Sequence, residues 1–310
     1  LASKQEKNLM LLAVLRALDI EAFPLLTSTR SHGKLLPEYA ILDQFDYVLV
    51  QANIDGKPML LDVGDPLRPM GYPALDALNY KAWLVDGKTS RWIDIKVPTT
   101  RNVFQVKCDL NDSYLKGHVQ TKYTGYGAIS ERNILQRDEV AGEFWGERLA
   151  ALSEDFSMSA FSTKNETALD QDFYSEFDFS INDLVMDNED MLYISPTIYT
   201  TFKESPFKAK KRYSNIDFSY PFTETYLFEF SIPAGYEIEQ LPESTNVKLP
   251  SDGGRFRYSV SSKADKIHIH TNLQIKQCRF SAAEYQAVKM MFDLMIEKQE
   301  EQIVLRKMTE

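Results

Sequence analysis

An almost unbroken apolar run near the start of the chain constrains the fold more than any other feature of the sequence. Within residues 5–18, apolar side chains fall on several sides of a helix, a pattern typical of a helix buried inside a domain. Three segments with strand-like composition follow, at residues 20–29, 45–54 and 57–63. Asp55-Gly56, between the last two, is a strong signal for a hairpin turn. This block therefore predicts a helix packed on an antiparallel sheet.

Three polar residues occupy defined places in the block. Lys4 lies at the start of the helix, Tyr47 in the next long strand, and Asp62 at the end of the strand after it. The segments that show this arrangement are residues 8–16, 25–30, 45–50 and 55–66. They resemble the transglutaminase-like (papain-like) superfamily, in which a Cys opens the helix, a His lies in the strand and an Asp ends the next one. The resemblance implies a transglutaminase-like helix-plus-antiparallel-sheet domain over residues 1–97, incomplete at its N-terminal side.

Lys4 and Tyr47, at the first two positions, do not supply the catalytic chemistry of that family. A helix start favours a thiolate because its unpaired N–H groups and dipole stabilise negative charge, whereas the ammonium of Lys4 is disfavoured there. A tyrosine, with an ordinary pKa of about 10, does not replace an imidazole as a base near neutral pH. Asp62 then has no imidazole to orient, and we interpret it as a strand-end residue. We therefore expect no catalytic residues, and we name Tyr47, Asp62 and Arg30 as binding candidates.

Other nucleophiles and bases do not complete a catalytic set. A one-residue shift of the alignment would make Ser3 the nucleophile, but it would still have no histidine base. His32 lies in a loop, where a solvated side chain is the ordinary interpretation. Cys108 and Cys278 both follow the transglutaminase-like block. An active enzyme would therefore have to assemble displaced residues from elsewhere in the chain.

The charge and composition bear on the classes of partner. The net charge of −10 and the pI near 5.1 disfavour nucleic acid, because phosphate binding needs clustered cations. The short basic cluster at residues 208–212 is interpreted as a solvated loop. No stretch approaches the roughly 20 apolar residues that span a bilayer. Two cysteines far apart in the sequence give no metal-ligand spacing, and we expect no metal and no cofactor.

Residues 98–310 predict a β-rich domain with two helices. Alternating apolar residues mark strands within residues 104–118, 157–198, 222–232 and 254–273. A helix-forming stretch near residues 126–152 interrupts them. A C-terminal amphipathic helix near residues 281–302 begins at a capping box of Ser281 and Glu284, and its polar end is expected to extend into solvent. The strands after residue 221 are expected to form an antiparallel set. The whole chain is expected to be α+β, with a β-sandwich-like second domain.

Two groups of residues in this domain show a second resemblance. They are Gly125-Tyr126-Gly127-Ala128 with Arg132, and Ser205-Pro206-Phe207 with Arg212-Tyr213 and residues 216–221. Both are similar to segments of Bacteroidetes-type multidomain proteins, in which a β-rich domain of unassigned function follows the transglutaminase-like part. That resemblance implies a periplasmic or secreted, cell-surface protein that contacts a further domain upstream.

Three functions remain open from the sequence. The first is a catalytically degenerate protein that binds or scaffolds a peptide, protein or glycan. The second is an active cysteine peptidase or transglutaminase-type enzyme that uses displaced residues. The third is a purely architectural surface module, which a solvent-open aromatic patch on strands 222–232 would favour. His268 and His270 share one strand face, and we interpret them as solvent-facing rather than as zinc ligands.

Overall fold

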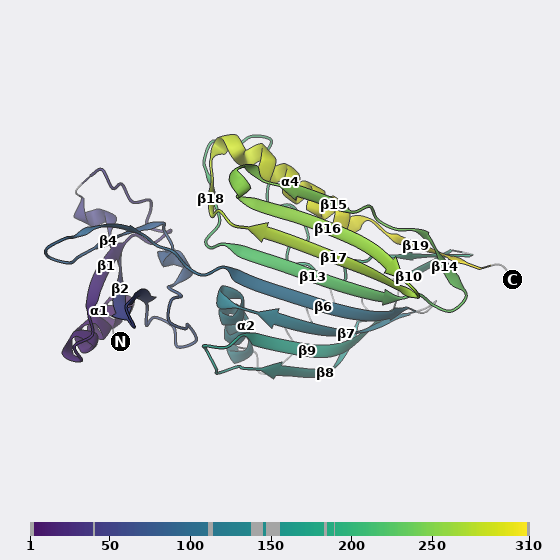
Figure 1. Cartoon of the computed structure of the whole chain (residues 1–310), viewed down its shortest axis with the longest axis horizontal. Helices are drawn as coiled ribbons and strands as arrows, with labels where there is room; N and C mark the ends of the chain where they lie inside the picture. Colours follow the sequence, from purple (N-terminus) through teal and green to yellow (C-terminus); the bar gives the residue numbers. More distant parts are fainter. Residues whose placement is uncertain are drawn as a thin grey trace. The chain divides into compact units, whose positions relative to one another are not determined.

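The computed structural model describes residues 3–39, 41–110, 114–137, 145–146, 156–182, 185–188 and 190–308. The chain forms two compact units, Leu1–Thr99 and Thr100–Glu310 (Figure 1). Both units combine helix and strand, so the expected α+β class is confirmed at that level. The division falls close to the boundary that the sequence analysis placed after Val97.

The first unit is a helix on a five-stranded antiparallel sheet. The helix is α1 (Lys4–Ala17), and the strand order is β3-β2-β1-β4-β5. The strands are β1 (Ala22–Thr27), β2 (Tyr47–Ile54), β3 (Lys57–Leu61), β4 (Lys81–Leu84) and β5 (Arg91–Asp94). Asp55 and Gly56, which join β2 to β3, have φ values of 51° and 74°, as a tight hairpin turn of type I′ requires. The predicted hairpin is therefore confirmed.

Helix α1 covers one face of this sheet through a narrow apolar contact. Leu12 packs with residues of β1, β2 and β3, namely Ala22, Val50, Ala52 and Leu61. The prediction that the helix is buried on several sides is wrong for the described structure, because Leu9, Met10 and Val14 are 47%, 67% and 50% exposed. The opposite face of the sheet has its own apolar cluster, which includes Leu25, Tyr47, Leu49, Ala82 and Leu84.

The second unit is built on an eight-stranded sheet, in the order β15-β16-β17-β13-β6-β7-β9-β8. Its strands are β6 (Thr100–Leu110), β7 (Tyr114–Tyr123), β8 (Ser157–Lys164), β9 (Phe173–Asn182), β13 (Phe222–Ser231), β15 (Thr245–Lys248), β16 (Gly254–Lys263) and β17 (Lys266–Ile275). At its centre β13 runs parallel to β6, whereas the other neighbours are antiparallel. The predicted antiparallel set of strands after residue 221 is confirmed, whereas the parallel pairing of β13 with β6 was not predicted. A long connection separates the two strands in the sequence, and a crossover of that kind permits parallel pairing.

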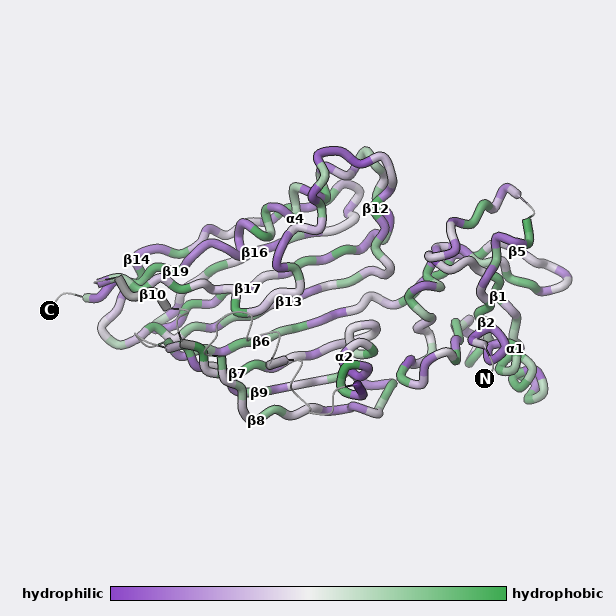
Figure 2. Tube along the Cα trace, turned by 180° about the vertical axis from the view of Figure 1, so that it is seen from behind, coloured by the Kyte–Doolittle hydropathy of each residue, from purple (hydrophilic) through white to green (hydrophobic). Residues whose placement is uncertain are grey.

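A second layer covers one face of the eight-stranded sheet. It contains a four-stranded sheet of β10 (Val185–Asn188), β11 (Met191–Ile194), β19 (Ile303–Lys307) and β14 (Tyr236–Gln240), with α2 (Gly125–Arg137) and α4 (Tyr285–Glu300). Seen from behind in Figure 2, α4 lies along β16, against which it packs. Phe104, Phe228, Phe292 and Leu305 come from these different elements and belong to one apolar core. A short pair, β12 (Ile216–Asp217) and β18 (Arg279–Phe280), lies outside both sheets.

The end of the last helix differs from the prediction. Its capping box is confirmed, because Ser281 and Glu284 cap the short turn η4 (Ala282–Glu284) that leads into α4. Lys298 and Gln299 are buried, so the prediction of a solvent-extended end is wrong. The reason is β19, which follows α4 and pairs with β11 and β14, and so holds the helix end against the unit.

The predicted helix over residues 126–152 is only partly described. Helix α2 ends at Arg137 in the structure. Most of the remaining predicted stretch lies outside the described residues, so its fold stays a prediction.

Candidate functional site

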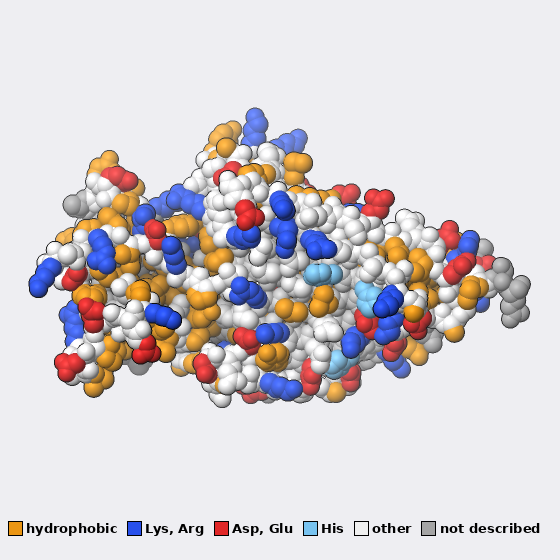
Figure 3. Space-filling view, viewed as in Figure 1, with side chains coloured by type: hydrophobic (Ala, Val, Ile, Leu, Met, Phe, Trp, Pro, Cys, Tyr) orange, Lys and Arg blue, Asp and Glu red, His pale blue; other side chains and the backbone are white. Residues whose placement is uncertain are grey.

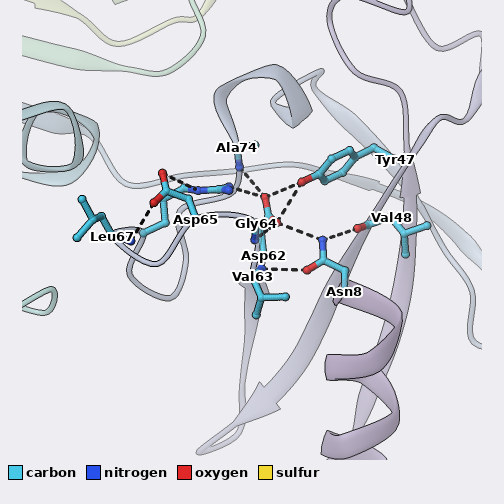
Figure 4. Close-up of polar contacts among 10 residues, drawn as sticks. Asn8, Tyr47, Val48, Asp62, Val63, Gly64, Asp65, Leu67 and Ala74 are labelled. Atoms are coloured by element: carbon cyan, nitrogen blue, oxygen red, sulfur yellow. Dashed lines mark hydrogen bonds and ion pairs between the residues drawn. The ribbon is translucent and has the colours of Figure 1, made fainter. Parts of the chain in front are cut away.

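The buried carboxylate of Asp62 is the centre of a polar cluster in the first unit (Figure 4). Asp62 directly follows β3, and its side chain is 0% exposed. Its Oδ1 accepts hydrogen bonds from Asn8 Nδ2 (3.1 Å), the Tyr47 hydroxyl (3.1 Å) and the Gly64 N–H (3.2 Å). Its Oδ2 accepts from Arg68 Nη1 (2.5 Å), the Ala74 N–H (2.8 Å) and the Tyr47 hydroxyl (3.2 Å). Both oxygens are therefore occupied by donors from a helix, a strand and a loop.

Asn8 is the polar link between α1 and the sheet. It is fully buried, and its Nδ2 also donates to the carbonyl of Val48 at 2.8 Å. Its Oδ1 accepts from the Val63 N–H at 2.9 Å. The amide thus satisfies backbone groups of β2 and of the segment after β3. Asn8 was not among the residues predicted from the sequence, although an isolated amide at the edge of an apolar helical run is the signal that could have found it.

Arg68 makes the ion pair of the cluster. Its side chain is 6% exposed and lies 2.5 Å from Asp62 Oδ2 and 3.7 Å from a carboxylate oxygen of Asp65. Burial alone would raise the pKa of Asp62, but the Ala74 N–H, the positive charge of Arg68 and the amide of Asn8 together lower it. Asp62 is therefore a fixed carboxylate. Arg68 was also missed, because nothing in the sequence distinguishes it from a surface arginine in a turn.

Tyr47 occupies the position that the family resemblance gives to a histidine. It is buried, and its hydroxyl donates to both oxygens of Asp62. Burial and the neighbouring negative charge of Asp62 raise the pKa of Tyr47 well above its ordinary value. The phenol therefore keeps its proton and acts as a hydrogen-bond donor, not as a base.

Lys4, at the position given to the nucleophile, begins α1 and is exposed. Its aliphatic stem passes beside the loop after Asp62, since a β-carbon added at Gly64 would lie 3.5 Å from Lys4 Cδ. Ser3 is the N-cap of α1 and accepts a hydrogen bond from the Glu6 N–H at 3.2 Å. The structure thus brings Lys4 next to the Asp62 cluster, while the Ser3 hydroxyl has a capping role.

The other candidates have separate surroundings. Arg30 donates to the carbonyl of Leu78 at 3.1 Å, and the His32 Nε2 lies 3.0 Å from the carbonyl of Asp43 in an exposed loop. Cys108 is buried in the core of the second unit, where burial raises the pKa of its thiol. Cys278 is a partly buried cysteine of the same unit.

An apolar groove of about 400 Å³ in the first unit could accept a ligand. It lies on the sheet face that also packs against α1, where Leu26 pairs with Trp83 and Trp83 with Trp92. The ring centroids of Trp83 and Trp92 are 5.3 Å apart, and that of Phe45 lies 5.8 Å from Trp92. Leu42, on its rim, is 80% exposed. This groove was not predicted from the sequence, because its walls come from three strands and a loop.

The described residues include no group of three or more His, Cys, Asp or Glu side chains that could hold a metal ion. Among the same residues, no helix has both the length and the apolar character needed to cross a membrane.

Comparison with known proteins supports a related fold for this chain. A family model described as a domain of unknown function with a solved structure (DUF3858) matches residues 190–305. The chain is also similar to the crystal structure of "a putative protease" from Parabacteroides distasonis, with a TM-score of 0.51 and 12% sequence identity. The alignment covers 98% of this chain and 44% of that one, so the chain spans less than half the length of its relative. At this identity the likeness is one of fold. No curated protein matches the chain.

Proposed function

We propose that this chain is a catalytically silent relative of transglutaminase-like proteins that binds a peptide or a protein segment through its first unit. The observation that supports this most directly is the full occupation of Asp62. In the family resemblance an aspartate orients an imidazole, whereas here both oxygens accept from Tyr47, Asn8, Arg68 and backbone N–H groups. A tyrosine with a raised pKa and a lysine at a helix start provide neither a base nor an activated nucleophile.

The binding part of the proposal rests on the apolar groove of the same unit. Aromatic rings with an exposed rim are suited to an apolar side chain of an extended peptide. Glu38, on the same rim, would favour a basic residue beside that side chain. We therefore assign the groove to a peptide with an apolar anchor next to Lys or Arg.

The two alternatives have less support. Cys108, the buried cysteine, lies in the core of the second unit with a raised pKa, which is the opposite of an activated thiolate. An architectural role was tied to an aromatic patch on strands 222–232, but Tyr226, Phe228 and Phe230 are buried in the core. The periplasmic or cell-surface location is also part of the proposal, and fractionation of the native host would test it.

The silent character can be tested on the unmodified chain. Incubation with an amine donor and a glutamine-containing peptide, and separately with a peptide substrate library, is expected to give no turnover above that of the heat-denatured protein. Turnover that is abolished by Lys4→Ala, Ser3→Ala or Tyr47→Phe would overturn the proposal.

The assignment of positions can be tested by restoring the chemistry. A Lys4→Cys, Tyr47→His double variant should be alkylated by iodoacetamide at about pH 6.5 faster than Lys4→Cys alone, because an imidazole beside Asp62 would stabilise the thiolate. Lys4→Cys, Tyr47→Phe is the matched control. Equal rates in all three would show that these are not the positions of a former catalytic set.

The binding role needs a separate measurement. Peptides selected from a display library on the whole chain should have an apolar anchor and should lose binding to a Trp92→Ala variant by at least tenfold. Tyr213→Ala, which removes an aromatic ring that is 93% exposed in the second unit, is the control and should bind as the unmodified chain does. Selection of no peptide, or selected peptides that bind Trp92→Ala equally well, would remove the groove from the proposal.

A further inference from the structure

The eight-stranded sheet of the second unit has one face turned away from the core. Along β6, for example, Phe104 and Val106 are buried while Gln105 and Lys107 are exposed. Figure 3 looks onto this outer face and shows basic side chains spread over it, with histidines toward one end. On this outer face, residues that are paired across neighbouring strands form rows that cross the sheet. The distribution of charge can therefore be described row by row.

Two neighbouring rows are basic and contain no carboxylate at their paired positions. One runs from Lys248 through Arg255 to Arg101. The other runs from Asn246 through Arg257 and Lys122 to Lys164. We call their basic residues the cationic band: Arg101, Lys122, Lys164, Lys248, Arg255 and Arg257. In a chain with a net charge of −10, this concentration of positive charge is a local property of the face.

Several carboxylates of the face lie in the other rows, and two of them lie beside basic side chains. Asp178 lies 2.7 Å from His118, and Glu229 pairs with Lys266. Within the band, Lys122 has a partner in Asp172 at 2.9 Å, contributed from just before β9. Arg101, Lys164 and Lys248 make no ion pair in the part of the chain that the structure describes.

The band borders a groove of about 440 Å³ over β6, β7, β9 and β8. Lys122 and Lys164 lie on one side of its floor, and the amides of Gln105 and Gln120 lie in the next row with the carboxylate of Glu176. The ring of Tyr174, between the two lysines in the register, adds an aromatic surface. Glu176 accepts from Gln120 and from Ser162, both at 3.2 Å, so its charge is held within the groove floor.

Two details describe the surroundings of Arg255 and Arg257, and the charges of Lys248 and Arg255 also act on Asp252. The Nε of Arg255 is buried and has no hydrogen-bond partner, although its Nη2 lies 3.4 Å from Asn272 Oδ1. Burial, followed by the charges of Arg257 and Arg255, lowers the pKa of His270 in the adjoining row. The two arginines thus act on a side chain in the next row, in addition to the larger effect of burial.

We propose that the cationic band and its groove bind an anionic polysaccharide. The lysines and arginines would pair with its carboxylate or sulfate groups, the amides of Gln105 and Gln120 with its hydroxyls, and Tyr174 with a sugar face. A peptide would gain most from adding a strand at a sheet edge, but this site lies mainly on the face, over β6, β7 and β9, which are paired on both sides in the ladder. Neutral amides and hydroxyls interspersed among cations fit a ligand rich in hydroxyl groups.

The experiment uses the whole chain and isothermal titration with polygalacturonate, a carboxylated polysaccharide. Binding is expected, and it should weaken as sodium chloride is raised from about 0.05 M to about 0.5 M. Fully methyl-esterified polygalacturonate, which lacks the charge, should bind at least tenfold more weakly. Lys122→Glu with Lys164→Glu should also lose at least tenfold in affinity.

A matched control keeps this test independent of folding. Lys116→Glu with Lys263→Glu makes the same charge change on the same face but outside the band, and it should lose less than threefold. Gln105→Ala, which leaves the charge unchanged, should weaken binding while the thermal unfolding temperature stays constant. Absence of binding, equal losses in both charge variants, or equal affinity for poly-L-glutamate would overturn the proposal. The proposal concerns the second unit and does not depend on the silent character of the first.

Discussion

The hydroxyl of Tyr47 donates to both carboxylate oxygens of Asp62, at 3.1 Å and 3.2 Å. Because Arg68 and Asn8 donate to the same carboxylate, the contact joins α1, β2 and the loop after β3 in one buried cluster. A pair of positions that resembles part of a catalytic set is here a structural link. Its energetic weight can be measured by removing one partner at a time.

Asp62→Ala is expected to destabilise the first unit far more than Tyr47→Phe. Removing the carboxylate leaves the buried charge of Arg68 without its partner, which costs about 3–5 kcal/mol. Removing the hydroxyl deletes one donor among several, which costs about 1 kcal/mol. Urea unfolding of the two variants, monitored by the fluorescence of Trp83 and Trp92 in a Trp145→Phe background, measures the free energy of unfolding of the first unit.

Tyr39→Phe, an exposed tyrosine of the same unit, is the control and should change the free energy of unfolding by less than about 0.5 kcal/mol. If Tyr47→Phe were as destabilising as Asp62→Ala, the hydroxyl rather than the ion pair would be the main link in the cluster.

The same cluster shows what the sequence could and could not predict. The hairpin at Asp55-Gly56 is a local signal, and it was predicted correctly because two adjacent residues determine the turn. The burial of α1 was overestimated, since an apolar run does not say how many surfaces are available to cover it. Asn8 and Arg68 were missed because their roles arise only when a helix, a strand and a loop meet.

The stability of the first unit should also depend on the protonation of Asp62. Its pKa is lower in the folded chain than the ordinary value of about 3.9, because hydrogen bonds and Arg68 outweigh the effect of burial. A depressed folded-state pKa contributes stability that is present above the unfolded value and is lost as the pH falls through the folded value. The difference in unfolding free energy between the unmodified chain and Asp62→Asn should therefore shrink as the pH is lowered from about 5 toward 2.

Since other carboxylates titrate in the same range, the difference between the two proteins, rather than either curve, is the quantity to measure. Asp19→Asn, a change at an exposed residue of the same unit, serves as the surface control. A difference for Asp62→Asn that grows toward low pH would contradict the lowered pKa.

Arg132 is expected to be the most sensitive residue of α2. It is 2% exposed, and its guanidinium donates to the carbonyls of Asn165, Ala168 and Gln171 at 2.8–3.1 Å, which fixes the loop between β8 and β9. Arg132→Met keeps much of the apolar volume but leaves these carbonyls without a donor, at a cost of about 2–4 kcal/mol. Thermal unfolding of the second unit measures this loss of stability.

Arg137→Met is the matched control for this change, because Arg137 is exposed on the same helix. It should lower the unfolding temperature little. Hydrogen exchange should also become faster in the loop of residues 165–172 in the Arg132 variant but not in the control. Equal unfolding temperatures for the two variants would mean that the loop does not depend on the guanidinium.

Gly117 in β7 is expected not to tolerate substitution even by alanine, which adds one methyl group. A β-carbon there would lie 2.5 Å from the carbonyl oxygen of Lys107 and 2.6 Å from the ring of Phe179. The ring can move, but the carbonyl belongs to the paired strand β6 and moves only with the ladder. Gly117→Ala should therefore cost about 1–3 kcal/mol, the range for overpacked cores. Adding Phe179→Leu should recover part of that loss and not all of it, because the backbone contact remains. Additive effects of the two substitutions would show that the ring is not what limits this position.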